Sequence, residues 1–253
     1  MNKDYYKTNA IYLELEKRND VQFIWVSGNA WILLYADNSS TVRVLAFVTG
    51  FSVCNLNGPS QERLGRARKI ALMLAETAGI KITFIEFDDK AESIVNVKQD
   101  SNLQSLEELK QWFRAAGLPV SGATTTKAIN DASSSAYQYW QRANLGAIKV
   151  SDLDLLRIDH TSGKVVDLYE LKRSFITFEA WKPYPADFPN FNVVANLAER
   201  IGSRFRIVYN IRETKPTFRD DASRVSLFAY SRASGAHALG SVTFDDFVNG
   251  VTL

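Results

Sequence analysis

The chain is poor in the side chains that build zinc and disulfide sites. Its 253 residues include one cysteine, Cys54, and two histidines, His160 and His237. A single cysteine cannot form an internal disulfide, and this usage is typical of a reducing compartment. Zinc sites built from Cys and His side chains are likewise excluded. Any metal site must therefore consist mainly of carboxylate and carbonyl oxygens, which suit Mg²⁺, Mn²⁺ or Ca²⁺.

Long apolar runs and an excess of one charge are also lacking. The longest strongly apolar run, AWILLYA, is far shorter than the ~18 residues that span a bilayer. The N-terminal MNKDYYKTN has no apolar core of a secretory signal. Lys and Arg total 30 against 28 Asp and Glu, so the formal net charge is only +2. These features predict a cytoplasmic protein with no membrane partner, whose affinity for nucleic acid would depend on how its charges are distributed.

Two regions of alternating apolar and turn residues are separated by a small, polar segment. In the first region, VQFIWVSG, AWILLYAD and TVRVLAFVTG predict an antiparallel meander, and helical spacing recurs over 62–79 and 103–117. The sequence PVSGATTTKAINDASSS, residues 119–135, is typical of a linker. We therefore expect an N-terminal α/β region over 1–120, used for recognition or dimerisation, and a second domain over 121–253.

The segment DLDLLRIDHTSGKVVDLYELKRS, residues 152–174, carries acids within strand-like runs. Gly163, in the turn 160–164, can adopt a positive φ and close an antiparallel hairpin. Side chains alternate between the two faces of a strand. A register with Asp159 opposite Val165 puts the aliphatic side chains of both strands on one face, and a slip of one residue would separate them, so the pattern selects this register or one two residues away.

This register predicts specific cross-strand pairs. It sets Ile158 opposite Val166, Leu156 opposite Leu168, and Arg157 opposite Asp167 on the reverse face.

The same register sets Asp154 opposite Glu170 at the end of the apolar stripe. Like charges directly opposite one another destabilise a sheet, and partial desolvation raises the cost. Lys172, ~7 Å further along the same face, can offset part of the repulsion. A divalent cation held by both carboxylates would offset it better, and this motivates the prediction of a metal site.

An acid on one strand, a hairpin, and Glu-x-Lys near the end of the next strand form the site pattern of the PD-(D/E)XK nuclease superfamily. This half of the chain resembles that family, which includes many restriction endonucleases. The order helix, strand with Asp, strand with Glu-x-Lys, helix, strand covers residues 133–211. The resemblance implies an α/β fold with a restriction-endonuclease-like mixed β-sheet core flanked by helices.

By residue, the resemblance implies that Asp154 and Glu170 bind Mg²⁺, for which Mn²⁺ can substitute. The backbone carbonyl of Leu171 would be a further ligand, and Lys172 would position or activate the attacking water.

Two nearby residues could support the metal ligands or replace one of them. The helix before the hairpin carries Gln138 where some family members carry a metal-binding Glu. Asp152 lies on the same face as Asp154 and would replace it as a ligand if the register moved. No proline precedes the acid in Ser151–Asp154, a departure from the family pattern that many members share.

Candidate nucleic-acid contacts follow the hairpin. The aromatic segment FITFEAWKPYPADFPNF could stack on bases or pack onto the sheet, and arginines from 200 to 224 could track phosphates or lie on a solvated face. A helix near 63–69 offers a second basic surface. The residues predicted to contact nucleic acid are Arg173, Ser174, Lys182, Tyr184, Arg200 and Arg204.

The leading prediction is a magnesium-dependent DNA endonuclease of the restriction or defence type. Cutting both strands calls for two active sites, so a homodimer is expected by symmetry. One alternative is an inactive nuclease fold that only binds nucleic acid or a protein. Another is a nuclease that acts on branched DNA or on RNA.

Overall fold

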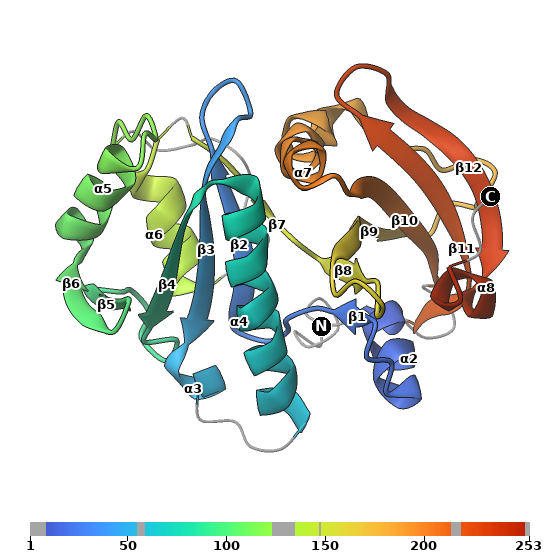
Figure 1. Cartoon of the computed structure of the whole chain (residues 1–253), viewed down its shortest axis with the longest axis horizontal. Helices are drawn as coiled ribbons and strands as arrows, with labels where there is room; N and C mark the ends of the chain where they lie inside the picture. The colour runs from blue at the N-terminus through green and yellow to red at the C-terminus, as the bar shows by residue number, and fades with distance from the viewer. Residues whose placement is uncertain (1–8, 55–58, 123–134, 147, 214–218, 251–253) are drawn as a thin grey trace. The chain divides into compact units, whose positions relative to one another are not determined.

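The computed structural model describes residues 9–54, 59–122, 135–146, 148–213 and 219–250. These residues form two mixed β-sheets of six strands each, flanked by helices (Figure 1). The predicted α/β class with mixed sheets and flanking helices is confirmed. In the described part of the chain, unit 1 comprises residues 26–153, and unit 2 comprises residues 9–25 and 154–250.

Unit 2 is built on a sheet with strand order β1-β8-β9-β10-β11-β12. Strands β9 and β10 are parallel and are connected through α7, whereas all other neighbours are antiparallel. The elements are α2 (Ala10–Arg18), β1 (Phe23–Ile24), β8 (Leu155–Ile158), β9 (Val165–Ser174), the 3₁₀ helix η1 (Pro185–Asp187), α7 (Phe188–Ile201), β10 (Arg204–Glu213), β11 (Arg219–Ser231), β12 (Gly235–Thr243) and α8 (Phe244–Val248).

The β8–β9 hairpin forms largely in the predicted register. Leu156 pairs with Leu168 and Arg157 pairs with Asp167, as predicted. At the turn end the prediction is wrong, because a register shift pairs Ile158 with Val165 instead of Val166.

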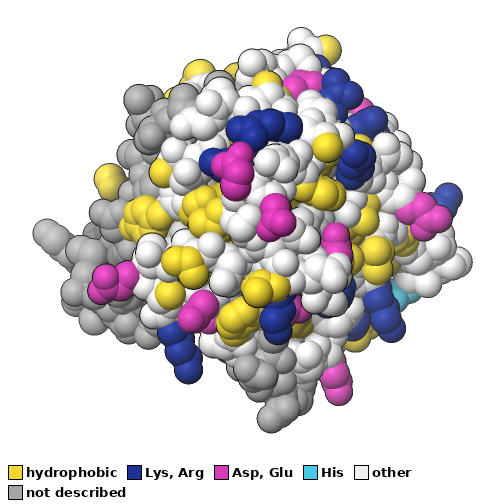
Figure 2. Space-filling view, turned by 90° about the vertical axis from the view of Figure 1, so that its left-hand side faces the viewer, with side chains coloured by type: hydrophobic (Ala, Val, Ile, Leu, Met, Phe, Trp, Pro, Cys, Tyr) yellow, Lys and Arg dark blue, Asp and Glu magenta, His cyan; other side chains and the backbone are white. Residues whose placement is uncertain are grey.

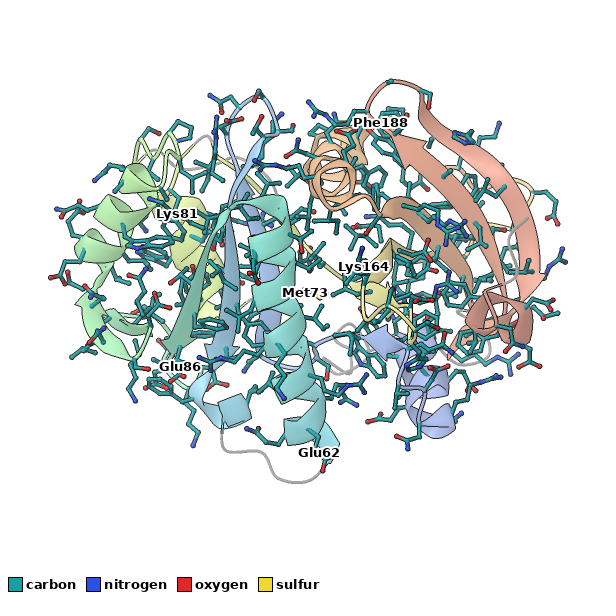
Figure 3. All side chains as sticks on the ribbon, viewed as in Figure 1. Glu62, Met73, Lys81, Glu86, Lys164 and Phe188 are labelled. Carbon is teal, nitrogen blue, oxygen red and sulfur yellow. The ribbon has the colours of Figure 1, made fainter. Side chains whose placement is uncertain are left out.

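The turn itself depends on Gly163. This residue has φ 68°, which L side chains rarely adopt. Its amide donates to the carbonyl of Asp159 over 2.7 Å, while Lys164 leads into β9 (Figure 3).

Unit 2 has its own hydrophobic core. Apolar side chains of α2 and α8 pack with side chains from β1, β8, β9, β10, β11 and β12. The fully buried members include Ile11, Leu15, Leu155, Val208 and Val225. Helix α2 forms because Asn9 caps its first turn, accepting from the Ile11 amide at 3.0 Å, and places Ile11 and Leu15 on one face.

Helix α7 contributes a second apolar cluster. Phe191 lies against Phe205 and Tyr230, with ring centroids 6.0 and 5.4 Å away. The helix ends at Gly202, whose φ of 69° suits a left-handed C-cap.

Unit 1 is built on a sheet with strand order β6-β5-β4-β3-β2-β7. Strands β3 and β4 are parallel, and α4 makes the crossover between them. The predicted helices at 62–79 and 103–117 correspond to α4 and α5. The elements are β2 (Ala30–Ala36), β3 (Val42–Gly50), α3 (Phe51–Cys54), α4 (Pro59–Ala78), β4 (Lys81–Phe87), β5 (Asn96–Gln99), β6 (Asn102–Ser105), α5 (Leu106–Ala115), α6 (Ala136–Asn144) and β7 (Lys149–Asp152).

The chain path between the units differs from the sequence expectation. The run VQFIWVSG was expected to join the N-terminal meander, but its strand β1 pairs with β8 in unit 2. The predicted boundary near residue 120 lies inside unit 1, as do α6 and β7. Of the predicted linker 119–135, residues 123–134 lie outside the described part of the chain. Unit 2 is therefore discontinuous in sequence.

No helix in the described ranges combines the length and hydropathy needed to cross a bilayer.

Candidate active site

The centre of the candidate site is Lys172 on β9. Its Nζ lies 2.9 Å from Glu170 Oε1 and 3.3 Å from Asp187 Oδ2. The side chains are partly shielded, with exposed fractions of 28% for Lys172, 12% for Glu170 and 31% for Asp187. Glu170 and Lys172 are two residues apart on one strand, so they share a face of the sheet. Asp187 reaches the same lysine from the end of η1.

The charge state of Lys172 follows from these neighbours. Burial acts to lower the pKa of the ammonium group, but the nearby charges of Glu170, Asp187 and Asp154 outweigh it and raise the pKa above its ordinary value of 10.5. The ammonium group also lies 5.4 Å from the centroid of the Phe191 ring. Lys172 is therefore a cation at neutral pH.

Asp154 lies directly before β8 and is held by two contacts. Its carboxylate Oδ2 accepts a hydrogen bond from the Leu171 amide at 2.7 Å. Its backbone carbonyl accepts one from the Tyr12 hydroxyl at 2.9 Å. Since Leu155 pairs with Tyr169, continuing the ladder by one residue brings Asp154 beside Glu170. Asp154 and Glu170 therefore each lie one residue from this pair, at the point where the β8–β9 ladder ends.

Tyr12 connects this acid to helix α2. Its ring stacks on Trp25, with centroids 5.7 Å apart and planes within 7°. Trp25 is 5% exposed and belongs to the core of unit 2. The hydroxyl that bonds Asp154 is therefore positioned by the stacking of its ring on Trp25.

The side chains fit a magnesium ion by donor type. Asp154 and Glu170 supply carboxylate oxygens, and Leu171 supplies a carbonyl next to the amide that bonds Asp154. Mg²⁺ is commonly held by one or two carboxylates, with water and substrate oxygens completing its coordination. Within the described residues, no group of three or more His, Cys, Asp or Glu side chains is arranged to hold a metal ion. The site can thus supply only part of an octahedral shell.

Gln138 and Asp152 belong to unit 1, not to the unit that carries Glu170. Gln138 forms a capping box with Ser135 at the start of α6, accepting from the Ser135 amide at 2.9 Å. Asp152 ends β7, where it pairs with Leu33 in the unit 1 sheet. Helix α6 precedes the hairpin in sequence as predicted, but it belongs to unit 1, and the helix of unit 2 that precedes β1 is α2.

Two of the arginines predicted to contact nucleic acid take part in internal ion pairs. Arg173 pairs with Asp220, and both side chains are mostly buried. Arg204 Nε lies 2.7 Å from Oδ1 of Asp167, which has no exposed surface. Buried carboxylates require such partners, so these contacts have a structural role. The Arg204 side chain is nonetheless 47% exposed.

The wider set of arginines between 200 and 224 does not form one free basic surface. Arg157 and Arg206 join Arg204 around Asp167, at 2.6 and 3.6 Å. Arg212 pairs with Asp220 at 3.3 Å. Lys215 lies outside the described residues. Figure 2 shows a different face, the side of unit 1 that carries α5, and basic and acidic side chains are interspersed on it.

The remaining predicted contacts lie on or beside the segment after β9. The Ser174 hydroxyl bonds the Tyr209 hydroxyl at 2.8 Å. Lys182 and Tyr184 are exposed, Tyr184 by 49%, and Arg200 is exposed at the end of α7. Exposure leaves these last three side chains accessible to a ligand.

Sequence reasoning missed Asp187 and Tyr12. Asp187 occupies the N-cap position of α7 but makes no capping hydrogen bond, because its carboxylate turns to Lys172. From sequence, an Asp followed two residues later by Pro189 indicates a helix start. The ion pair of this Asp with Lys172 was therefore not predicted. No sequence signal links Tyr12 to Asp154, which is 142 residues away.

Comparisons with known proteins identify no family for this chain. No family model matches, and no curated protein matches. Among solved structures, the sex pheromone precursor from Lactobacillus salivarius subsp. salivarius UCC118 aligns over 83% of this chain with 10% sequence identity and a TM-score of 0.17. The alignment covers 65% of that protein, so this chain spans less than two thirds of its length. So low a TM-score carries no argument about fold or function.

Proposed function

We propose that unit 2 is a magnesium-dependent DNA endonuclease that hydrolyses phosphodiester bonds, with a restriction-endonuclease-like arrangement of its sheet. The observation that carries the proposal is that Asp154, directly before β8, accepts from the Leu171 amide of β9, between Glu170 and Lys172, which form an ion pair on that strand. The parallel β9–α7–β10 unit beside the β8–β9 hairpin supports the same family resemblance.

Mg²⁺, when bound, would supply a water of lowered pKa and would neutralise phosphate charge. Asp154 and Glu170 would hold the ion together with the carbonyl of Leu171. The Leu171 amide and the Tyr12 hydroxyl orient Asp154.

Lys172 acts in this scheme as a fixed positive charge. Its raised pKa keeps the proton on Nζ, so it donates hydrogen bonds to phosphate oxygens and does not remove a proton from water. Negative charge grows on those oxygens as the bond to the leaving group breaks, and a preorganised cation stabilises that change. Asp187 keeps the ammonium group in place until substrate binds.

The proposed partner is DNA, and the proposed assembly is a homodimer, because each chain offers one such site and a double-strand cut needs two. Unit 1 would serve recognition or dimerisation. A cytoplasmic restriction or defence role would accord with this activity.

Nicking of supercoiled plasmid with Mg²⁺, and with EDTA instead, tests the proposal. We expect Mg²⁺-dependent cleavage, lowered on the order of 100-fold or more in Lys172→Ala and Glu170→Gln, because each change removes a group that stabilises developing charge. Lys164→Ala, an exposed lysine in the turn of the same hairpin, is the matched control and should cleave like wild type. Equal cleavage by wild type and Lys172→Ala would contradict the proposal.

A second candidate function is a nuclease-like module that only binds nucleic acid or a protein. Lys172 already compensates Glu170 and Asp187, so the repulsion that motivates a metal ion is met in part by the chain itself. DNA binding by a wild type that is inert with Mg²⁺ and Mn²⁺ would favour this candidate. A panel of duplex, flap, junction and RNA substrates separates a sequence-specific nuclease from one that acts on branched DNA or on RNA.

A further inference from the structure

An exposed phenylalanine directly follows the strand that carries the candidate site. Phe175 has 75% of its surface exposed, although burying such a side chain would stabilise a protein by about 1.5–3 kcal/mol. It stands three residues after Lys172, which corresponds to roughly 10 Å along an extended chain. Phe175 would therefore lie one to two nucleotides away from the scissile phosphate that Lys172 is proposed to contact.

The backbone on both sides of Phe175 is held by one phenol. The Tyr209 hydroxyl is within donating distance of the Ser174 carbonyl at 3.1 Å and the Ile176 carbonyl at 2.5 Å, and it also hydrogen-bonds with the Ser174 hydroxyl at 2.8 Å. The Tyr209 ring is fixed in turn by Trp181, which stacks on it with centroids 4.1 Å apart and planes within 4°. Phe175 is therefore presented to solvent by a preorganised backbone.

The segment that follows β9 contains a second exposed ring and an exposed lysine, and strand β11 adds an arginine. Tyr184 is 49% exposed, and its ring lies edge-on to Trp181 at 6.2 Å. Lys182 is also exposed, and it lies between Phe175 and Tyr184 in the sequence. Arg224 on β11 lies over the Phe178 ring at 5.6 Å. Exposed aromatic faces beside cations are the combination that binds single-stranded nucleic acid.

We propose that Phe175 and Tyr184 stack on unpaired bases, so that the preferred substrate is DNA with single-stranded nucleotides next to the cleavage point. Within a continuous duplex both faces of every base are covered by neighbouring bases, whereas an unpaired base has a free face for an aromatic ring. The inference rests on the proposed nuclease function for the placement of the cut, and its binding component is measurable without cleavage.

The test measures binding of the full-length protein to labelled single-stranded and duplex oligonucleotides of equal length, in EDTA, by fluorescence anisotropy. Phe175→Ala should weaken single-strand binding roughly 5- to 100-fold and change duplex binding less than about 2-fold. Phe175→Trp should keep the affinity. Leu103→Ala is the matched control, because Leu103 is also an exposed apolar residue, 70% exposed, and lies in unit 1.

A fluorescent base analogue, 2-aminopurine, reports stacking directly. Its emission should fall when a single strand carrying it binds wild type or Leu103→Ala, and this quenching should be lost with Phe175→Ala. Far-UV circular dichroism and melting curves should coincide for all variants, since none alters a buried group.

Equal losses on single strand and duplex, or no loss on either, would overturn the inference even if wild type cleaves DNA with Mg²⁺. Conversely, single-strand-specific loss and lost quenching in a protein that never cleaves would support the stacking role and reject the nuclease proposal. The two proposals can therefore fail separately.

Discussion

At the scale of single residues, the pKa of Lys172 depends on acids from more than one element of the fold. From sequence, Glu170 and Lys172 form a pair on one strand face. The structure adds Asp187 at 3.3 Å, and this second acid helps to raise the lysine pKa despite partial burial. A lysine that served as a general base at neutral pH would need a pKa shifted in the opposite direction.

The raised pKa predicts how Lys172→Met changes stability with pH. The variant leaves two carboxylates without their cation and should lower the free energy of unfolding by about 1–3 kcal/mol. Because the folded-state pKa lies above the ordinary 10.5, this contribution is fully present below that value and is lost as pH rises through the folded pKa. Urea unfolding of both proteins from about pH 7 to about 10, below the ordinary pKa, should therefore give a constant stability difference. A difference that already disappears near neutral pH would contradict the raised pKa.

At the scale of elements, α2 takes the place expected for a helix much later in the chain. Sequence order favoured SAYQYWQRA, residues 135–143, as the helix before the acid-bearing hairpin, but that helix is α6 of unit 1. Helix α2 packs its Ile11 and Leu15 in the unit 2 core and directs the Tyr12 hydroxyl to the Asp154 carbonyl. The helix is thus a candidate positioning element for the first acid.

Replacing Tyr12 with phenylalanine tests that role, because the ring can keep its stacking on Trp25 while the hydroxyl is removed. We expect a loss of only about 0.5–1.5 kcal/mol in stability and a roughly 10- to 100-fold loss in cleavage or in apparent Mg²⁺ affinity. Titrations of cleavage rate against Mg²⁺ concentration, paired with melting curves, separate the two effects. Tyr139→Phe, on an exposed tyrosine of α6, is the control. A lowered melting temperature with an unchanged Mg²⁺ dependence would assign Tyr12 to structure alone.

At the scale of the whole molecule, unit 2 is interrupted by unit 1. The chain leaves unit 2 after Trp25 and returns at Asp154. Ile24 pairs with Leu156 in an antiparallel ladder, so Trp25 and Leu155 stand at the next pair of positions. The ends of the interruption are thus adjacent, as they are in a hairpin, and every member of the unit 2 core cluster comes from unit 2 itself.

This arrangement predicts that residues 26–153 can be replaced by Asn-Gly, which together with Asp154 forms a three-residue, glycine-containing connection between Trp25 and Leu155. The shortened protein should unfold cooperatively in urea, with circular dichroism and tryptophan fluorescence giving coincident transitions. A matched variant that carries the same turn together with Leu155→Asp, a fully buried position, should not fold. Non-cooperative melting of the first variant would show that unit 2 depends on unit 1.

The β8–β9 hairpin could be predicted from sequence alone, because strand alternation and one turn glycine are local constraints. They determined the Leu156–Leu168 and Arg157–Asp167 pairs and the alignment of Glu170 with Lys172. The register shift next to Ile158, which leaves Val166 as an extra residue on β9, could not be predicted from this alternation. An extra residue beside a turn changes the pairing without changing the apolar pattern.

Only the tertiary structure decided which distant segments complete unit 2. Contacts of Tyr12 with Asp154, and of Asp187 with Lys172, join residues that no periodicity relates. The internal ion pairs of Arg173, Arg204 and Arg206 were equally invisible, because composition counts charges and packing assigns their partners. Local patterns determine strands and turns, whereas burial of a shared core selects the elements that come together.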